Sequence, residues 1–385
     1  MKNILIVTPF FVPAYSYGWI VRVAYEQAKW LVARWYNVTV ITTDVFDSKQ
    51  RNSILNETIE WIKIKRFKNI SNHLAKFQNL YLPIWMKKWL KNNISNYDIV
   101  HIHDIYNLCT YWAWKYALEN NKKYFIQPHG TLSDIRIQSR KSFIKKWILK
   151  KMKTIFDNAN WWFALTKTEI QEIENITDNT NIQELPNGID TKKFENIKKA
   201  DIHKMYNLDK NIKIITFLWR IQYIKWLDIS FNILTKLDET FKNWRFLVIW
   251  PDEWEKDKLI KLSKDLWIED KIIWYWEENT DKKYELLAWS DLFLFNSRNE
   301  GFWMTIIEAC MSQIPIIIST WCPIYDIENY NIWYKIDNSN TINFVDKIKD
   351  ILTNKWSYQK NLKKYVYDNY ELKILNDKLI NYYEK

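Results

Sequence analysis

Two cations stand five positions apart in the segment FLWRIQYIKWLD at residues 217–228, directly after an apolar run. They are Arg220 and Lys225. A guanidinium binds phosphate oxygens as a planar fork, whereas an ammonium acts on them as a point charge. Because one loop carries both groups, the pair suits a diphosphate. Two solvated surface cations give the same pattern, so this signal is weak by itself.

Two carboxylates, Glu300 and Glu308, are separated by seven residues in RNEGFWMTIIEACMSQIPIIIS at residues 298–319. We expect a helix to begin between them. The backbone N–H groups around Trp303 to Thr305 would then lie at a helix N-terminus, where free N–H groups and the helix dipole attract phosphate. This segment therefore predicts a second contribution to an anion site.

A further loop near the amino terminus has the same character. Gly18 and Trp19 precede a helix that we expect to begin near Ile20. With a glycine at position 19, a Gly-Gly loop would feed the helix N-terminus and suit a phosphate. Alone, this pattern is also weak.

Three histidines follow or end predicted strands of the first half. His129 lies in QPHGTLS after the run KYFIQ, as either a surface histidine or a general base. His101 and His103 alternate in DIVHIHD, so both side chains face one side of a strand near its end. A metal site is the alternative, but no Cys or carboxylate set completes one, and Asp104 alone is insufficient. We expect no metal and no cofactor.

The chain holds 24 Trp and only 4 Gly in 385 residues. An average usage of roughly 7% would give about 27 Gly. Trp35 and Trp267 follow helical runs where a left-handed residue is usual, and Trp244 follows Asn where an Asn-Gly turn is expected. We hypothesise that many Trp are UGA codons that the source organism decodes as Gly. A genuinely Trp-rich protein is the alternative. Aromatic residues suit the apolar contexts of Trp114, Trp147, Trp161 and Trp162.

With glycine at positions 219, 226 and 303, the two segments become FLGRIQYIKGLD and EGFGMTIIEA. In this form they resemble the donor loop and signature of family 4 retaining glycosyltransferases, which have the GT-B fold. The resemblance extends over the chain, through MKNILIVTPFF, LPNGID and RFLVIWP. One departure is Gln313, where the family usually has a small residue or Gly; we regard that position as structural.

The resemblance implies a role for each motif. Glu300 would lie near the donor sugar hydroxyls, Glu308 would accept hydrogen bonds from the ribose hydroxyls, and His129 would lie by the sugar at the reaction centre. The implied catalytic residues are Glu300, His129, Arg220 and Lys225. The implied donor-binding residues are Gly18, Trp19, Arg220, Lys225, Glu300, Gly301, Phe302, Trp303, Met304, Thr305 and Glu308, with His101, His103 and His129 on the acceptor side.

Short β-rich runs alternate with helical stretches throughout, which predicts an α/β protein with parallel sheets. The break at ELPNGIDTKKF divides two series of strands. We expect the GT-B architecture: two Rossmann-like doubly wound domains facing a central cleft. The expected divisions are an acceptor-binding domain at 1–187, a donor-binding domain at 188–365, and a helix at 366–385 that crosses back to the first domain.

The net charge is +11, and residues 135–156 carry eight basic side chains and no acidic one. Apolar residues recur there at helical spacing, as in a basic amphipathic helix that lies on an anionic membrane. A surface helix whose apolar stripe faces the core fits at least as well. Three Cys without metal-ligand spacing, and no apolar stretch of membrane-spanning length, favour a cytoplasmic location, peripheral at the inner face of the membrane if the helix binds lipid.

These observations predict a retaining, metal-independent transferase that moves a sugar from a nucleoside-diphosphate sugar to the hydroxyl of a glycan or lipid-linked acceptor, in bacterial cell-envelope polysaccharide or glycolipid synthesis. A nucleotide-sugar epimerase and an inverting transferase fit the Arg, Lys and paired Glu pattern less well. A catalytically inactive GT-B protein is the leading alternative if the Trp are authentic. Nucleic-acid binding is supported only by charge, and we do not expect it.

Overall fold

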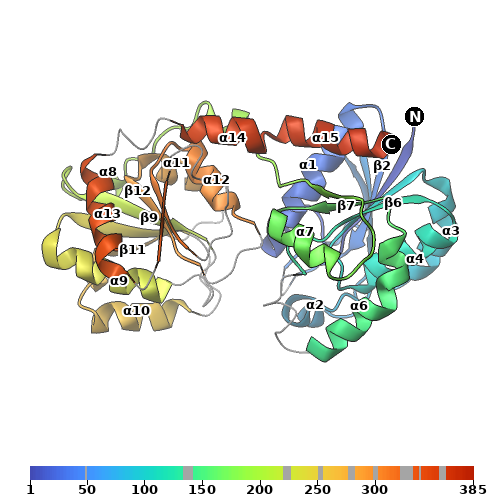
Figure 1. Cartoon of the computed structure of the whole chain (residues 1–385), viewed down its shortest axis with the longest axis horizontal. Helices are drawn as coiled ribbons and strands as arrows, with labels where there is room; N and C mark the ends of the chain where they lie inside the picture. The colour runs from blue at the N-terminus through green and yellow to red at the C-terminus, as the bar shows by residue number, and fades with distance from the viewer. Residues whose placement is uncertain are drawn as a thin grey trace. The chain divides into compact units, whose positions relative to one another are not determined.

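The structure is a computed structural model that describes residues 1–47, 50–132, 142–219, 227–249, 255–275, 282–297, 302–320, 333–337, 340–354 and 361–385. Within these residues the chain forms two compact units. The first comprises Met1–Gly188 and Lys373–Lys385, and the second comprises Ile189–Leu372. Each unit has one sheet with helices packed on it (Figure 1).

The first unit contains an eight-stranded sheet of order β3-β4-β2-β1-β5-β6-β7-β8, in which only β3 is antiparallel to its neighbour. Strand β5 is buried along its whole length, as a parallel strand covered on both faces should be. The strands are β1 (Asn3–Val7), β2 (Asn37–Thr43), β3 (Asn56–Ile59), β4 (Ile62–Phe67), β5 (Ile99–His103), β6 (Lys123–Gln127), β7 (Trp161–Ala164) and β8 (Ile182–Glu184).

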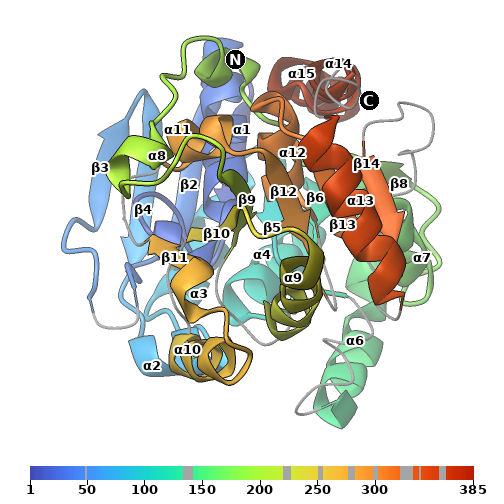
Figure 2. The same cartoon turned by 90° about the vertical axis from the view of Figure 1, so that its left-hand side faces the viewer.

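The second unit contains a six-stranded, fully parallel sheet of order β11-β10-β9-β12-β13-β14. Its strands are β9 (Lys213–Leu218), β10 (Trp244–Ile249), β11 (Ile272–Tyr275), β12 (Leu292–Phe295), β13 (Ile316–Ser319) and β14 (Trp333–Ile336). Two parallel α/β sheets confirm the expected GT-B fold class, whose second sheet is drawn with its covering helices in Figure 2.

Most of the helices lie between successive strands, and α13 and α14 follow the last strand. In the first unit they are α1 (Trp19–Ala33), α2 (Asn72–Gln78), α3 (Met86–Asn93), α4 (Leu108–Glu119), α6 (Ser142–Asp157) and α7 (Lys167–Glu174). In the second unit they are α8 (Ile202–Met205), α9 (Leu227–Thr240), α10 (Lys256–Asp265), α11 (Lys282–Trp289), α12 (Met304–Met311), α13 (Thr341–Thr353) and α14 (Leu362–Tyr370).

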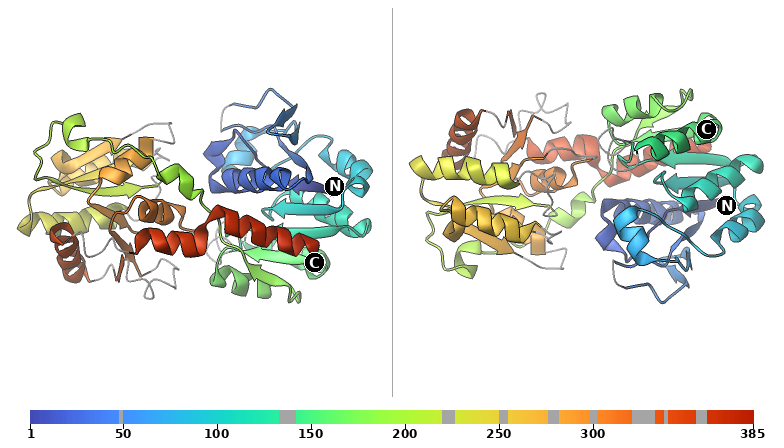
Figure 3. Two further views of the ribbon diagram at one scale, coloured as in Figure 1. Left: turned by 90° about the horizontal axis from the view of Figure 1, so that it is seen from above. Right: turned by 90° about the horizontal axis from the view of Figure 1, so that it is seen from below.

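The last helix, α15 (Leu372–Glu384), packs on the first unit beside α1 (Figure 3). Two ion pairs attach it: Arg34 contacts Asp377 at 2.6 Å, and Lys2 contacts Glu384 at 2.6 Å. Tyr383 is fully buried among the strands of the sheet. The carboxyl-terminal helix therefore belongs to the core of the first unit.

Two of the tryptophans that prompted the glycine hypothesis have left-handed backbones. Trp35 (φ 66°) and Trp267 (φ 59°) each directly follow the C-cap residue of a helix. At Trp35 the N–H groups of positions 35 and 36 bond to Val32 and Leu31, and the corresponding bonds recur after α10. This is the Schellman arrangement, whose left-handed residue is usually Gly.

Two more tryptophans are left-handed. Trp61 (φ 67°) and Glu60 (φ 47°) form the two-residue loop between β3 and β4, where positive φ at both positions favours Asn-Gly. Trp85 (φ 69°) precedes α3. The side chains of Trp35, Trp61, Trp85 and Trp267 are 79%, 84%, 71% and 91% exposed. An aromatic residue with an unfavourable backbone and an exposed ring has no packing reason to be there.

The expectation for Trp244 is wrong. Trp244 is the first residue of β10, is fully buried, and donates its indole N–H to Asp238 at 3.1 Å. The neighbouring residues form a strand start instead of a tight turn, and strand pairing overrides the local turn signal. Trp114 and Trp162 are also fully buried, as aromatic side chains in a core should be.

We predict opposite effects of glycine at the two kinds of site. Trp35→Gly, Trp61→Gly, Trp85→Gly and Trp267→Gly should each raise the free energy of unfolding by about 0.5–1 kcal/mol, because relief of the left-handed strain exceeds the added backbone entropy. Trp114→Gly should lower it by more than about 3 kcal/mol by opening a cavity. Urea denaturation of the five variants measures both effects. Destabilisation by Trp35→Gly or Trp267→Gly would contradict the strain argument.

Candidate functional site

The predicted donor segments follow the two strands at which the order of the second sheet reverses. Strand β9 lies between β10 and β12, so connections run outward in opposite directions from β9 and β12. Trp219 directly follows β9, and α12 begins nine residues after β12 ends. In open parallel sheets, ligands bind beyond the carboxyl ends of the strands at this reversal point. The topology thus brings Trp219 and the start of α12 to one edge of the sheet.

Glu308 lies in α12 with its side chain fully buried. Its Oε1 accepts hydrogen bonds from Lys283 Nζ at 2.7 Å and from Tyr284 Oη at 2.8 Å. Both partners come from α11, and the side chain of Lys283 is also buried. A buried carboxylate is stable only with a charged or hydrogen-bonding partner, and here it has both.

Three polar atoms of residues 303–308 are buried without a hydrogen-bond partner in the described parts of the chain. They are Glu308 Oε2, Thr305 Oγ1 and Trp303 Nε1. Buried polar groups are normally paired, so the unpaired Glu308 Oε2 and Thr305 Oγ1 of α12 favour a place for a polar ligand. Trp303 Nε1 adds nothing to this argument in a protein with glycine at position 303. Trp303 is the residue before α12 and makes no side-chain cap, which leaves the N–H groups of the first turn without that partner. The arrangement suits an anionic ligand with hydroxyl groups.

The indole of Trp303 is buried and stacks on Phe302 with ring centroids 5.0 Å apart. Its φ is −105°, so the backbone at this position does not require Gly. Trp219 is half-buried and contacts Phe295 edge to face, at 6.4 Å between centroids. Both rings therefore occupy space at the edge where the predicted phosphate site lies. The predicted residues Arg220, Lys225, Glu300 and Gly301 lie outside the described residues.

The three predicted histidines of the first unit form one buried cluster. The rings of His101 and His103 stack with centroids 4.4 Å apart, so the two side chains do face one side of β5. His103 Nδ1 hydrogen-bonds His129 Nε2 at 2.8 Å, and His101 Nδ1 hydrogen-bonds Tyr383 Oη at 2.5 Å. A chain of contacts thus runs from the QPHG loop after β6 to the carboxyl-terminal helix. His129 is buried, so it is not a surface histidine.

Burial keeps this cluster neutral. It lowers the pKa of His103 to about 3 and the pKa of His101 and His129 well below 6.5, with the neighbouring imidazoles lowering the latter two further. A single N–H in each ring is sufficient for the observed bonds. His129 Nδ1, His103 Nε2 and His101 Nε2 have no partner among the described residues. Neutral rings of this kind donate or accept hydrogen bonds and are weak bases at neutral pH.

The loop that carries His129 is held in a left-handed conformation, with φ of 58° at His129 and 72° at Gly130. Glu169, buried in the first turn of α7, accepts a hydrogen bond from the N–H of Gly130 and another from Leu165 N at 2.7 Å. Strained backbone persists where the surroundings determine it, and it concentrates at functional sites. Glu169 is therefore a positioning residue for this loop.

Sequence reasoning missed Glu169, Lys283 and Tyr383. The first has a local signal, because Thr166 and Glu169 have the T-x-x-E spacing of a capping box, and Thr166 Oγ1 accepts a hydrogen bond from Glu169 N at 3.1 Å. That pattern predicts a helix start, but it does not predict the hydrogen bond that the Glu169 side chain accepts from Gly130 N. Lys283 and Tyr383 contact residues 25 and 282 positions away, so no spacing in the sequence indicates them.

The remaining predicted residues have simpler surroundings. Gly18, with φ 96° and ψ −158°, precedes α1, which begins at Trp19, and no side chain caps the helix. In α6 the described apolar side chains of Leu149, Met152 and Ile155 are buried in the core. That half of the basic segment is therefore a surface helix with its apolar stripe facing inward. Across the described residues no group of His, Cys, Asp or Glu is arranged to hold a metal ion, and no helix there is long and apolar enough to cross a membrane.

Comparisons with known proteins find two glycosyltransferase family models along the chain. Residues 20–193 match the family model described as Glycosyltransferase Family 4, and residues 198–369 match Glycosyl transferases group 1. The chain is 26% identical over 230 residues to N-acetyl-alpha-D-glucosaminyl L-malate synthase of Bacillus anthracis. That alignment covers 58% of this chain and 56% of the relative, so the match spans a little over half of the relative's length.

Solved structures resemble the whole chain at low identity. Sucrose-phosphate synthase from Thermosynechococcus elongatus superposes with a TM-score of 0.76 at 14% identity, covering 100% of this chain and 98% of that one. HepE from Anabaena, solved in complex with UDP and glucose, gives a TM-score of 0.74 at 13% identity, covering 99% of both chains. These likenesses establish the fold, and with the two family models they support a GT-B glycosyltransferase.

We predict that acid selectively destabilises the histidine cluster. An unfolded imidazole titrates near pH 6.5, whereas these rings stay neutral to lower pH in the folded state. Below pH 6.5 the unfolded chain binds more protons, so stability falls by about 1.4 kcal/mol per pH unit for each ring. Urea unfolding at pH 7.5 and 5.5 measures the slope. His101→Phe should reduce it, and His73→Phe, at an exposed position, should not. Equal slopes in all three proteins would contradict the argument.

The Lys283–Glu308 pair should behave as a coupled unit. Lys283→Met should cost about 3–5 kcal/mol of unfolding free energy, because it leaves a buried carboxylate without its cation. The double variant Lys283→Met, Glu308→Gln should lose less than the sum of the single losses. The matched control is Lys282→Met in the more exposed Lys282–Glu285 pair, where the cost should stay below about 1 kcal/mol. Additive losses at 283 and 308 would show that the pair is not coupled.

Proposed function

We propose that this GT-B glycosyltransferase transfers a sugar from a nucleoside-diphosphate sugar to an acceptor hydroxyl with retention of anomeric configuration and without a bound metal. The observation that carries the proposal is the buried Glu308 carboxylate in α12, which has one oxygen held by Lys283 and Tyr284 and the other without a partner among the described residues. A carboxylate held in this way suits two adjacent ribose hydroxyls. The N–H groups at the start of α12 suit the diphosphate.

Each predicted residue then has a role in the reaction. Arg220, Lys225 and the N-terminus of α12 stabilise the negative charge that develops on the leaving diphosphate, which is the part a divalent cation plays elsewhere. Glu300 lies by the donor sugar hydroxyls. The acceptor hydroxyl attacks on the face from which the diphosphate departs, since no carboxylate nucleophile is expected.

His129 lies on the acceptor side of the reaction centre. Its lowered pKa makes the ring a hydrogen-bonding group for a sugar more than a proton acceptor. Its bond to His103 fixes the orientation of the ring, and Glu169 fixes the adjacent backbone through Gly130. The domains at 1–187 and 188–365 act as the acceptor-binding and donor-binding halves.

The acceptor is a glycan or lipid-linked saccharide of polysaccharide or glycoconjugate synthesis, and the protein works in the cytoplasm at the inner face of the membrane. The basic residues 135–156 provide a surface for anionic lipid. Lys150 and Lys151 are exposed on α6, which supports an electrostatic contact, although the described apolar stripe of that helix faces the core. No nucleic acid takes part.

The identity of the tryptophans at positions 19, 219, 226 and 303 decides between this proposal and a catalytically inactive GT-B protein. Indole rings at 219 and 303 fill the edge of the sheet where the diphosphate would approach the backbone. UGA at these four codons, with UGG at Trp114 and Trp162, would mean that the natural protein has glycine at the four positions. UGG at all six codons would favour the inactive protein.

A binding experiment tests the donor site. Calorimetry should detect UDP binding to the quadruple variant Trp19→Gly, Trp219→Gly, Trp226→Gly, Trp303→Gly. Adding Glu308→Gln to this variant should weaken UDP binding by about 10- to 100-fold, because hydrogen bonds to a charged group are lost. The first protein should discriminate between UDP and 2′,3′-dideoxy-UDP by a similar factor, whereas the Glu308→Gln protein should bind both equally. Retained discrimination after Glu308→Gln would refute the ribose role. Anomeric retention is read from the product by proton NMR.

A further inference from the structure

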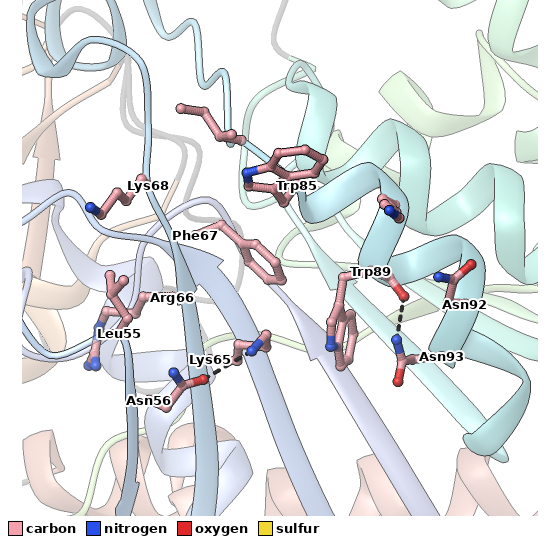
Figure 4. Close-up of a pocket in the computed structure, with 12 residues that line it drawn as sticks. Leu55, Asn56, Lys65, Arg66, Phe67, Lys68, Trp85, Trp89, Asn92 and Asn93 are labelled. Atoms are coloured by element: carbon pink, nitrogen blue, oxygen red, sulfur yellow. Dashed lines mark hydrogen bonds between the residues drawn. The ribbon is translucent and has the colours of Figure 1, made fainter.

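A basic groove of about 610 Å³ lies on the first unit between strands β3 and β4 and helix α3. Figure 4 shows Phe67 of β4 directed toward Trp89 of α3, with Lys65 near the two rings and Lys68 directed away from them. No acidic side chain is among the described residues that line the groove. None of these residues belongs to the predicted donor or acceptor motifs, so the groove is a feature that the proposed reaction leaves unexplained.

Aromatic rings form the middle of the groove. Phe67 and Trp89 meet edge to face with centroids 6.0 Å apart, and Trp89 also contacts Tyr97 at 6.3 Å. Phe67 is buried and Trp89 is half-buried, so packing holds both rings in place. A rigid, partly exposed indole is a good surface for the apolar face of a sugar ring, because it loses little conformational entropy on binding.

Three lysines line the same groove as these rings. Lys68 and Lys88 are exposed, and Lys65 is half-exposed and hydrogen-bonds Asn56 at 3.1 Å. None has a carboxylate partner within the described parts of the chain. The fourth cation of the lining, Arg66, is already paired with Glu57. The groove therefore carries uncompensated positive charge next to an aromatic surface.

We infer that this groove binds an anionic saccharide, a sugar that carries a carboxylate or phosphate group. The ring packs on Trp89 and Phe67, the acidic group lies between Lys68 and Lys88, and the amide of Asn92 is available to the hydroxyls. The volume is in the range of small-ligand sites and suits one or two sugar units. This inference deepens the proposed function, since it assigns acidic sugars to the acceptor glycan.

The inference does not depend on the uncertain identity of Trp85, whose exposed ring lies at the rim beneath Lys88, with 5.7 Å between Nζ and the ring centroid. The packed rings of Phe67 and Trp89 remain when position 85 has no side chain. Trp85→Gly therefore serves as an internal control, and we expect it to retain saccharide binding.

Calorimetry with a glucuronic acid trisaccharide, glucose 6-phosphate, maltotriose and inorganic phosphate tests the groove. The full chain should bind at least one acidic sugar about tenfold more tightly than maltotriose or inorganic phosphate, and the two acidic probes distinguish a carboxylate from a phosphate. Lys68→Gln, Lys88→Gln should weaken that binding by about tenfold or more, since each exposed charge contact contributes up to about 1 kcal/mol. Trp89→Leu should weaken it similarly.

The matched control is Lys87→Gln, Lys91→Gln, which removes the same charge from exposed positions of α3 outside the groove. It should leave saccharide affinity within twofold. Equal losses in the two double variants, tight binding of inorganic phosphate alone, or displacement of the sugar by a short single-stranded RNA would each overturn the inference. We also measure UDP affinity of the same variants in the protein with glycine at positions 19, 219, 226 and 303. This measurement separates the saccharide groove from the proposed donor site, because loss of UDP binding with intact saccharide binding counts against the donor site only.

Discussion

The return of four described helices to their sheet depends on a left-handed residue directly after the helix C-cap. Schellman bonds end four of the helices that lead back into a strand, and the residues at the left-handed position are Trp35, Asn121, Trp267 and Gln313. Because these connections are short, they set where the next strand begins, and therefore the register of β2, β6, β11 and β13 in their sheets. Glycine adopts this conformation without strain, and asparagine does so at small cost. Gln313, where the family usually has a small residue or Gly, occupies such a left-handed position with φ 59°. The departure from the family pattern therefore concerns the backbone conformation.

Both candidate clusters contain a buried polar group that is paired on one side only. Glu308 is held through Oε1 and His129 through Nε2, while Glu308 Oε2 and His129 Nδ1 have no partner among the residues that the structure describes. Packing alone favours full pairing or an apolar replacement. Half-pairing keeps each group oriented while leaving one atom for a ligand. The supporting residues lie on elements distant in sequence, which is how the fold fixes a ligand-binding atom without filling its site.

The sequence predicted ten of the parallel strands because each is a short apolar run bounded by polar or turn residues. It did not indicate β3, β7, β8 or β14, whose residues are polar or few and are strands because a neighbour pairs with them. It placed His101, His103 and Glu308 correctly on their elements. It could not give Lys283, Tyr383 or Glu169 as their partners, because burial and contact over long separations come from tertiary packing. The turn expected at Trp244 failed for the same reason: pairing in β10 overrides a local preference.

The free-energy cost of a left-handed backbone bears on whether the natural protein has tryptophan at these four positions. A left-handed backbone costs roughly 1–2 kcal/mol per residue with a side chain, so four such tryptophans together cost about 4–8 kcal/mol. A domain is stable by only about 5–15 kcal/mol. At 71% to 91% exposure these rings return little burial energy. A chain with tryptophan at these four positions would lose much of its free energy of unfolding, whereas glycine there would cause no strain. Selection keeps a destabilising residue only where that residue has a function. None of the four lies in the donor or histidine clusters, so the conformations support decoding of these positions as glycine.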